Sequence, residues 1–86
     1  LPPRVSERGI ELAWRSHPEA DRYEVVFYTS QLTQIMSMGE TADTFAVVPH
    51  STRTLLARGG SEVLYRVVAR QDGDEVTHSP VADLPR

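Results

Sequence analysis

Short runs of alternating apolar and polar residues dominate this chain and constrain its fold more than any other feature. Between Ile10 and Trp14 every second residue is large and apolar, and Tyr23, Val25 and Phe27 repeat the pattern. An alternation with a period of two is typical of a β-strand that turns one face toward a core. Further strands are expected at 34–38, 44–48, 64–70 and 75–78.

Turn-forming residues separate these runs. Polar residues around Pro18 and the polar stretch 39–43 interrupt the alternation, and Pro49 ends one run. Asp72-Gly73 favours a two-residue type I′ hairpin turn, because both central residues of that turn need positive φ. The segment 51–57 is compatible with either a strand extension or one helical turn.

No stretch holds a 3.6-residue apolar repeat over ten residues, so the crossover helices of a parallel α/β fold are not expected. Many short strands joined by turns predict an all-β fold, a two-sheet antiparallel β-sandwich of about seven strands.

The length of 86 residues suits one domain. Prolines near both ends predict linker-like segments at 1–5 and 80–86, and the first residue is Leu1, so we expect a domain excised from a larger protein. No apolar run approaches the length of a membrane span, so a membrane is expected only through a parent protein.

The charges disfavour nucleic acid as a partner. The net charge is −3, and the nine positive residues are arginines scattered along the chain. Binding to phosphates requires clustered cations, so no nucleic-acid partner is expected.

The residues that carry chemistry do not form a recognisable site. The sequence has no cysteine, and His17, His50 and His78 are too far apart for a common zinc motif. Asp72 and Asp74 fit a solvated turn better than a calcium loop. We therefore expect no catalytic residue, no metal and no cofactor, and not an enzyme.

Four segments resemble fibronectin type III domains, which belong to the immunoglobulin-like β-sandwich superfamily. They resemble the second strand with its core tryptophan, the third strand, the Y-x-V-x-A sixth strand and the final strand of that family. The segments are Ile10-x-Leu12-x-Trp14, Tyr23-x-Val25, Tyr65-Arg66-Val67-Val68-Ala69 and Thr77-His78-Ser79-Pro80.

The resemblance implies a non-catalytic protein-interaction or spacer module of a multidomain bacterial protein, located outside the cytoplasm, in the periplasm or at the cell surface. The alternative is an accessory carbohydrate-binding domain of a hydrolase, for which Tyr28 is the one clearly exposed aromatic residue expected. The resemblance also implies that the Tyr65 hydroxyl bonds back to nearby backbone, although Gly59 stands where the family usually has leucine.

One surface is a candidate for binding. If Tyr23, Val25, Tyr65 and Val67 point inward, their neighbours along each strand point outward. The third and sixth strands are neighbours in the family, so these outward residues would meet, with methionines extending the patch and arginines framing it. Its expected partner is another protein, a neighbouring domain or a second copy of the chain. This candidate face consists of Val26, Tyr28, Met36, Met38, Arg66, Val68 and Arg70.

Overall fold

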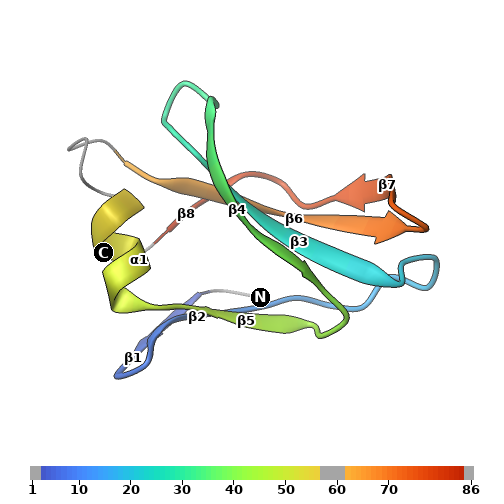
Figure 1. Cartoon of the computed structure of the whole chain (residues 1–86), viewed down its shortest axis with the longest axis horizontal. Coiled ribbons are helices and arrows are strands. Elements are labelled where there is room, and N and C mark those ends of the chain that lie inside the picture. Colours follow the sequence, from blue (N-terminus) through green and yellow to red (C-terminus); the bar gives the residue numbers. More distant parts are fainter. Residues whose placement is uncertain (1–2, 57–61, 85–86) are drawn as a thin grey trace.

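The structure is a computed structural model that describes residues 3–56 and 62–84 (Figure 1). The strands are β1 (Arg4–Ser6), β2 (Gly9–Ala13), β3 (Arg22–Tyr28), β4 (Gln34–Thr41), β5 (Phe45–Val48), β6 (Leu64–Gln71), β7 (Asp74–His78) and β8 (Ala82–Asp83). One helix, α1 (His50–Leu56), lies between β5 and β6.

The described strands form two antiparallel sheets. One has the order β1-β2-β5, and the other has the order β4-β3-β6-β7, with β8 also paired to β6. In Figure 1 the first sheet runs along the bottom of the molecule, and β3 and β6 lie above it. The expectation of an all-β fold with two antiparallel sheets is therefore confirmed.

The core lies between the sheets and follows the period-two pattern. The inward positions of β3 and β6 supply Tyr23, Val25, Tyr65 and Val67, as predicted, and Phe27 is fully buried beside them. The rest of the core comes from both sheets, from α1 and from the flanking segments: Ile10, Leu12, Val48, Leu56, Val63, Ala69 and Leu84.

Trp14 differs from the expected core anchor. It follows the last residue of β2, is only half-buried, and packs against the core from its margin. Its backbone N–H still donates to the Thr44 carbonyl at 2.9 Å, which continues the β2–β5 ladder by one residue. The alternation placed Trp14 on the correct side, but the strand ends before the indole reaches the interior.

The β6–β7 hairpin has the predicted turn. Asp72 has φ 51° and Gly73 has φ 88°, and the flanking residues Gln71 and Asp74 are paired across the hairpin. Two successive positive φ values are those of a type I′ turn, whose twist matches that of the strands it joins. The Asp72 N–H also donates to the Asp21 carboxylate at 3.3 Å.

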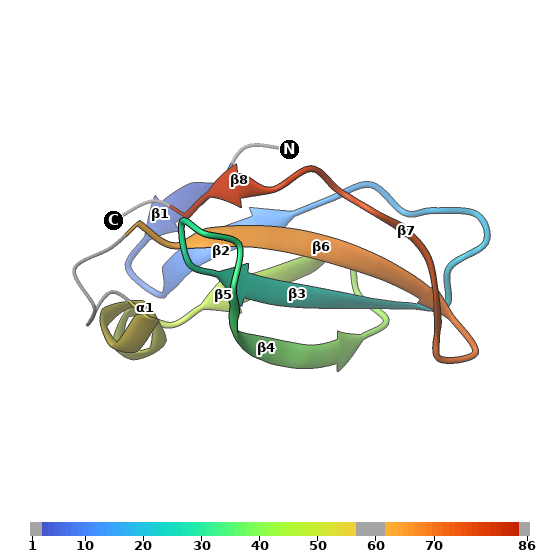
Figure 2. The ribbon, with the colours of Figure 1, turned by 90° about the horizontal axis from the view of Figure 1, so that it is seen from above.

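Two strands were not predicted, and one segment had been compatible with either a strand or a helical turn. β1 overlaps the segment 1–5 and β8 lies within 80–86, both expected to be linker-like, and both strands are paired in the sheets. The segment left open between strand and helix forms α1, whose first turn is closed by the Arg53 N–H bonding to the Pro49 carbonyl at 2.9 Å. α1 lies at one end of the two sheets (Figure 1, Figure 2), and its Leu56 enters the core, which favours the helical turn at this position.

Candidate interaction surface

The sheet β4-β3-β6-β7 has an outer face that points away from the core. Val26 is paired with Arg66, and Glu24 is paired with Val68. Directly opposite residues of antiparallel strands share a face, and this face is the one opposite to Tyr23, Val25 and Val67. The structure therefore brings together Val26, Val68 and Arg66 as expected, and alternation adds Tyr28 and Arg70.

The two valines are not exposed, which corrects the expected apolar patch. Val26 and Val68 are each only 4% exposed, although neither belongs to the core cluster. Val68 lies between Arg66 and Arg70 on the same face of β6, and the long side chains of such neighbours shield the shorter one from water. The outer face therefore presents polar groups above a small buried apolar layer.

The two methionines lie on the other side of the sheet, which is a second correction. Met36 is paired with Phe27, a core residue, so its side chain shares the inward side of β4 rather than the outer face. Met38 follows on that side by alternation. Both are exposed, and β4 is the edge strand of its sheet. Met36 and Met38 therefore do not extend the patch around Val26.

Arg66 is held in place by two contacts on the outer face. Its guanidinium carbon lies 5.9 Å from the centre of the Tyr28 ring, and its Nε donates to the Ser79 carbonyl at 3.1 Å. The Val67 N–H donates to the Ser79 hydroxyl at 2.9 Å, which secures Ser79 in turn. Tyr28 is thus half-buried beside a cation, and its ring is not a free stacking surface.

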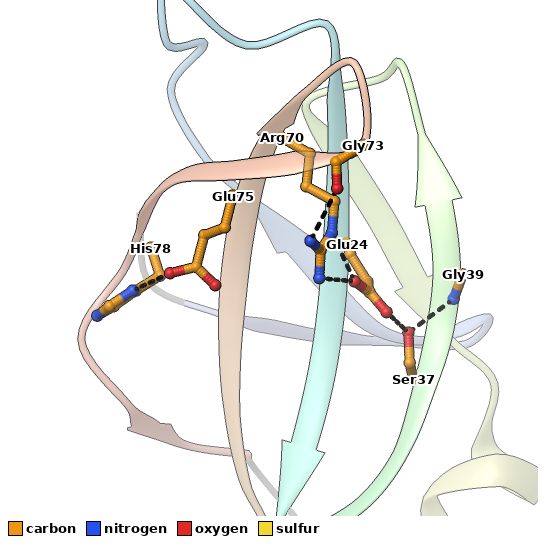
Figure 3. A network of polar contacts seen from close by, with 7 residues as sticks. All are labelled: Glu24, Ser37, Gly39, Arg70, Gly73, Glu75 and His78. Carbon is orange, nitrogen blue, oxygen red and sulfur yellow. Dashed lines mark hydrogen bonds and ion pairs between the residues drawn. The ribbon is translucent and has the colours of Figure 1, made fainter.

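Arg70, Glu24 and Ser37 form a polar network across β6, β3 and β4 (Figure 3). Nε and Nη2 of Arg70 donate to the same carboxylate oxygen of Glu24 at 3.0 and 2.8 Å. The Ser37 hydroxyl donates to the other carboxylate oxygen and accepts from the Gly39 N–H at 3.0 Å. Three strands of the sheet are therefore joined by side chains as well as by backbone ladders.

The network changes the acidity of its members. The hydrogen bond from Ser37, followed by the hydrogen bond and charge of Arg70, lowers the pKa of Glu24 below its ordinary value of 4.5, against an opposing effect of burial. The Glu24 carboxylate raises the pKa of Arg70 in return. Glu24 is therefore ionised at neutral pH, and the pair is a charged, hydrogen-bonded one.

β4 has an exposed apolar edge, of which only Met36 and Met38 were among the residues predicted for the candidate face. Among the described strands it pairs with β3 alone, and Ile35, Met36 and Met38 are 42%, 38% and 37% exposed. The turn that precedes β4 adds the exposed Leu32. We call Leu32, Ile35, Met36 and Met38 the β4 apolar edge. In the sequence, this edge is indicated only by an apolar run with few charges. The run alone does not show that β4 lies at the edge of a sheet, because that depends on its pairing with β3.

The β4 strand is also irregular. Its register with β3 shifts twice, between Glu24 and Val26 and between Phe27 and Tyr28. Gly39 has φ 83°, a conformation that suits a bulge. Bulges bend an edge strand and disfavour its regular pairing with another strand. The β4 apolar edge is thus better suited to side-chain contacts than to sheet extension.

The histidines are dispersed over the described structure. The His17 Nδ1 accepts from the Glu19 N–H at 3.2 Å, the His50 Nε2 lies 3.0 Å from the Ser6 carbonyl, and the His78 Nδ1 lies 2.9 Å from a Glu75 carboxylate oxygen. Across residues 3–56 and 62–84, no three histidine or acidic side chains are close enough together to hold a metal ion. No described helix has the length and apolar character needed to cross a membrane.

Tyr65 lies in the core, as the resemblance implies, but its expected hydroxyl contact is not tested. Burial raises the pKa of Tyr65, in keeping with its place in the core. Gly59, which stands six residues before it, lies outside the described residues. The expected bond from Tyr65 to the preceding loop therefore stays a prediction.

Comparison with known proteins gives no family. No protein-family model matches the chain, and no curated protein or solved structure matches it significantly.

Proposed function

We propose that the chain is a non-catalytic protein-interaction module of the fibronectin type III kind. Two features support this proposal. In the five-stranded sheet β3 and β6 are direct neighbours, as the resemblance implies. Tyr23, Val25, Tyr65 and Val67, which lie in the segments that carry the resemblance, all belong to the core.

The observation that carries the interaction role is the β4 apolar edge. Three large apolar side chains of one edge strand, Ile35, Met36 and Met38, are exposed within four residues of one another. Methionine adapts its shape to different contacts, and clustered apolar residues on a surface mark interaction sites. We propose that a partner protein or a neighbouring domain packs its apolar side chains on this edge, and that the parent is an extracytoplasmic bacterial protein.

The carbohydrate-binding alternative has less support. Sugar rings need open aromatic faces, and Tyr28, the residue expected to supply one, lies beside the Arg66 guanidinium. Phe45 is exposed on β5, but a single phenylalanine does not make a row of stacking rings.

The interaction role is testable by photocrosslinking in the host cell. A photocrosslinking amino acid in place of Met36 is expected to yield one defined adduct, whose partner peptide is identified by mass spectrometry. The same residue in place of Leu55, an exposed apolar side chain on α1, is the matched control. Adducts at position 36 that are no more abundant or specific than those at position 55 would overturn the proposal.

The contribution of the apolar side chains is tested with the identified partner. Ile35→Ser together with Met38→Ser is expected to weaken its binding by about tenfold or more, because exposed apolar anchors supply much of the energy of an interface. Leu55→Ser is expected to leave the affinity unchanged. Equal affinity of the double variant and the wild type would show that β4 is not part of the interface.

A further inference from the structure

A hollow of about 380 Å³ opens beside Trp14, away from the β4 apolar edge. Its apolar wall is made by Trp14 and Tyr23, whose ring centres lie 5.9 Å apart at an interplanar angle of 57°, together with Val67 and Ala69. The volume falls within the range of small-molecule sites, which begins near 300 Å³. The lining belongs to the segment after β2, to the strands β3, β6 and β7, and to Ser79, which follows β7.

Hydrogen bonds fix the segment after β2, which forms one part of the wall of the hollow. The backbone N–H of His17 donates to the Tyr23 hydroxyl at 2.8 Å, and the Ala20 N–H donates to the His17 carbonyl at 3.0 Å. These bonds tie the segment after β2 to a core residue of β3. The hollow is therefore formed before any ligand enters, which lowers the entropic cost of binding.

The indole N–H of Trp14 is a hydrogen-bond donor without an acceptor in the described part of the chain. Its Nε1 is shielded from solvent and has no hydrogen-bond partner among the described residues. A buried tryptophan N–H normally finds an acceptor. The residue that carries this unpaired donor is one that lines the hollow.

The charge of the lining is opposite to that of the chain. The chain has twelve acidic residues against nine arginines, yet the described residues that line the hollow include no carboxylate side chain. They include Arg15, His17 and His78, of which His78 already contacts Glu75. Arg15 makes no hydrogen bond or ion pair with the rest of the described chain, so its guanidinium is available to a ligand.

We propose that this hollow binds a small aromatic carboxylate. The ring of the ligand packs against Trp14, Tyr23 and Val67, and its carboxylate pairs with Arg15. An aromatic ring suits a wall made of two tilted aromatic side chains, and a carboxylate matches the charge of the arginine. A cationic ligand would face Arg15, and a purely apolar one would leave the guanidinium without a counter-charge.

The proposal is tested by NMR titration of the ¹⁵N-labelled chain with phenylacetate. Trp14 is the single tryptophan, so its indole N–H gives one resolvable signal. Phenylacetate is expected to shift that signal saturably, with a Kd in the millimolar range typical of so small a ligand. Phenylacetamide keeps the ring and lacks the charge, and we expect it to bind at least about fivefold more weakly. Acetate keeps only the charge and is expected to give no saturable shift.

Two variants separate the charge from the hollow. Arg15→Gln is expected to weaken phenylacetate at least about fivefold while leaving phenylacetamide unchanged. Arg4→Gln, which removes an exposed arginine from β1, is the matched control and is expected to change neither. The spectrum of each free variant shows whether it is folded. A non-saturable response to phenylacetate, equal affinity for the amide, or an unchanged affinity in Arg15→Gln would each overturn the proposal.

Discussion

Arg70 on β6 bonds twice to one carboxylate oxygen of Glu24 on β3, through Nε at 3.0 Å and Nη2 at 2.8 Å. The Ser37 hydroxyl on β4 occupies the other oxygen, so both acceptor atoms of Glu24 are engaged. Both side chains of the ion pair are mostly shielded from water, since Arg70 is 26% exposed and Glu24 is 17% exposed. The pair therefore differs from a freely solvated surface salt bridge, whose contribution is close to zero.

The first prediction concerns the strength of this network. Glu24→Gln removes the charge and weakens the acceptors for Arg70 and Ser37, and we expect it to lower the free energy of unfolding by about 1–2 kcal/mol. Urea denaturation at pH 7 measures the change. Glu7→Gln, at an exposed turn position, is the control and should stay within about 0.5 kcal/mol of wild type. A Glu24→Gln chain as stable as the control would show that the network adds nothing.

The second prediction is the pH dependence of the same pair. The pKa of Glu24 is lower in the folded chain than its ordinary value of 4.5, so its stabilising effect is fully present above about pH 4.5. The effect is lost as the pH falls further, through the folded pKa. We expect the stability difference between wild type and Glu24→Gln to be constant from pH 6 to pH 8 and to shrink as the pH falls below 4.5. Urea melts of both chains at several pH values test this, and a difference that grows on acidification would contradict it.

The third prediction compares two glycines that have positive φ. A Cβ built on Gly9 would lie 2.1 Å from the Val48 carbonyl oxygen, whereas a Cβ on Gly73 meets nothing within 4 Å. Gly73→Ala should therefore cost only the backbone strain, about 1–2 kcal/mol. Gly9→Ala must also push β2 and β5 apart, and we expect it to cost at least about 3 kcal/mol. Thermal or urea melts compare the two, and equal losses would refute the close contact at Gly9.

The fourth prediction ranks two aromatic residues. Phe27 is fully buried at the centre of the core, whereas Trp14 is half-buried at its margin. Phe27→Ala should cost about 3–5 kcal/mol, and Trp14→Ala should cost at least about 1 kcal/mol less, because part of the indole is already in water. Chemical denaturation of both variants provides the test. A larger loss for Trp14→Ala would place the energetic centre of the core at the indole.

Much of the fold follows from local patterns. The alternation at Tyr23, Val25 and Phe27 predicted which side of β3 enters the core, and Asp72-Gly73 predicted the β6–β7 turn. Both depend on properties of neighbouring residues, the two-residue period of a strand and the freedom to adopt positive φ. Such signals are present before any distant contact forms.

The candidate face was harder to predict. Val26 and Val68 were placed on the correct side, yet their burial depends on long neighbouring side chains across two strands. Met36 and Met38 were assigned to the wrong side of the sheet, because the side is set by the register of β4 with β3, which shifts twice. A shift of one residue exchanges the two faces of a strand, and the alternation within β4 carries no information about that register.

By itself, the amino-acid sequence determined where strands form, which residues within a strand share a side, and where the chain reverses at Asp72-Gly73. The tertiary structure decided the pairing of β4, the helical state of α1, the marginal place of Trp14 and the joining of Glu24 to Arg70 and Ser37. The physical reason is distance along the chain. Strand periodicity and turn geometry act over a few residues, whereas register, burial and ion pairing depend on residues that meet only when both sheets have assembled.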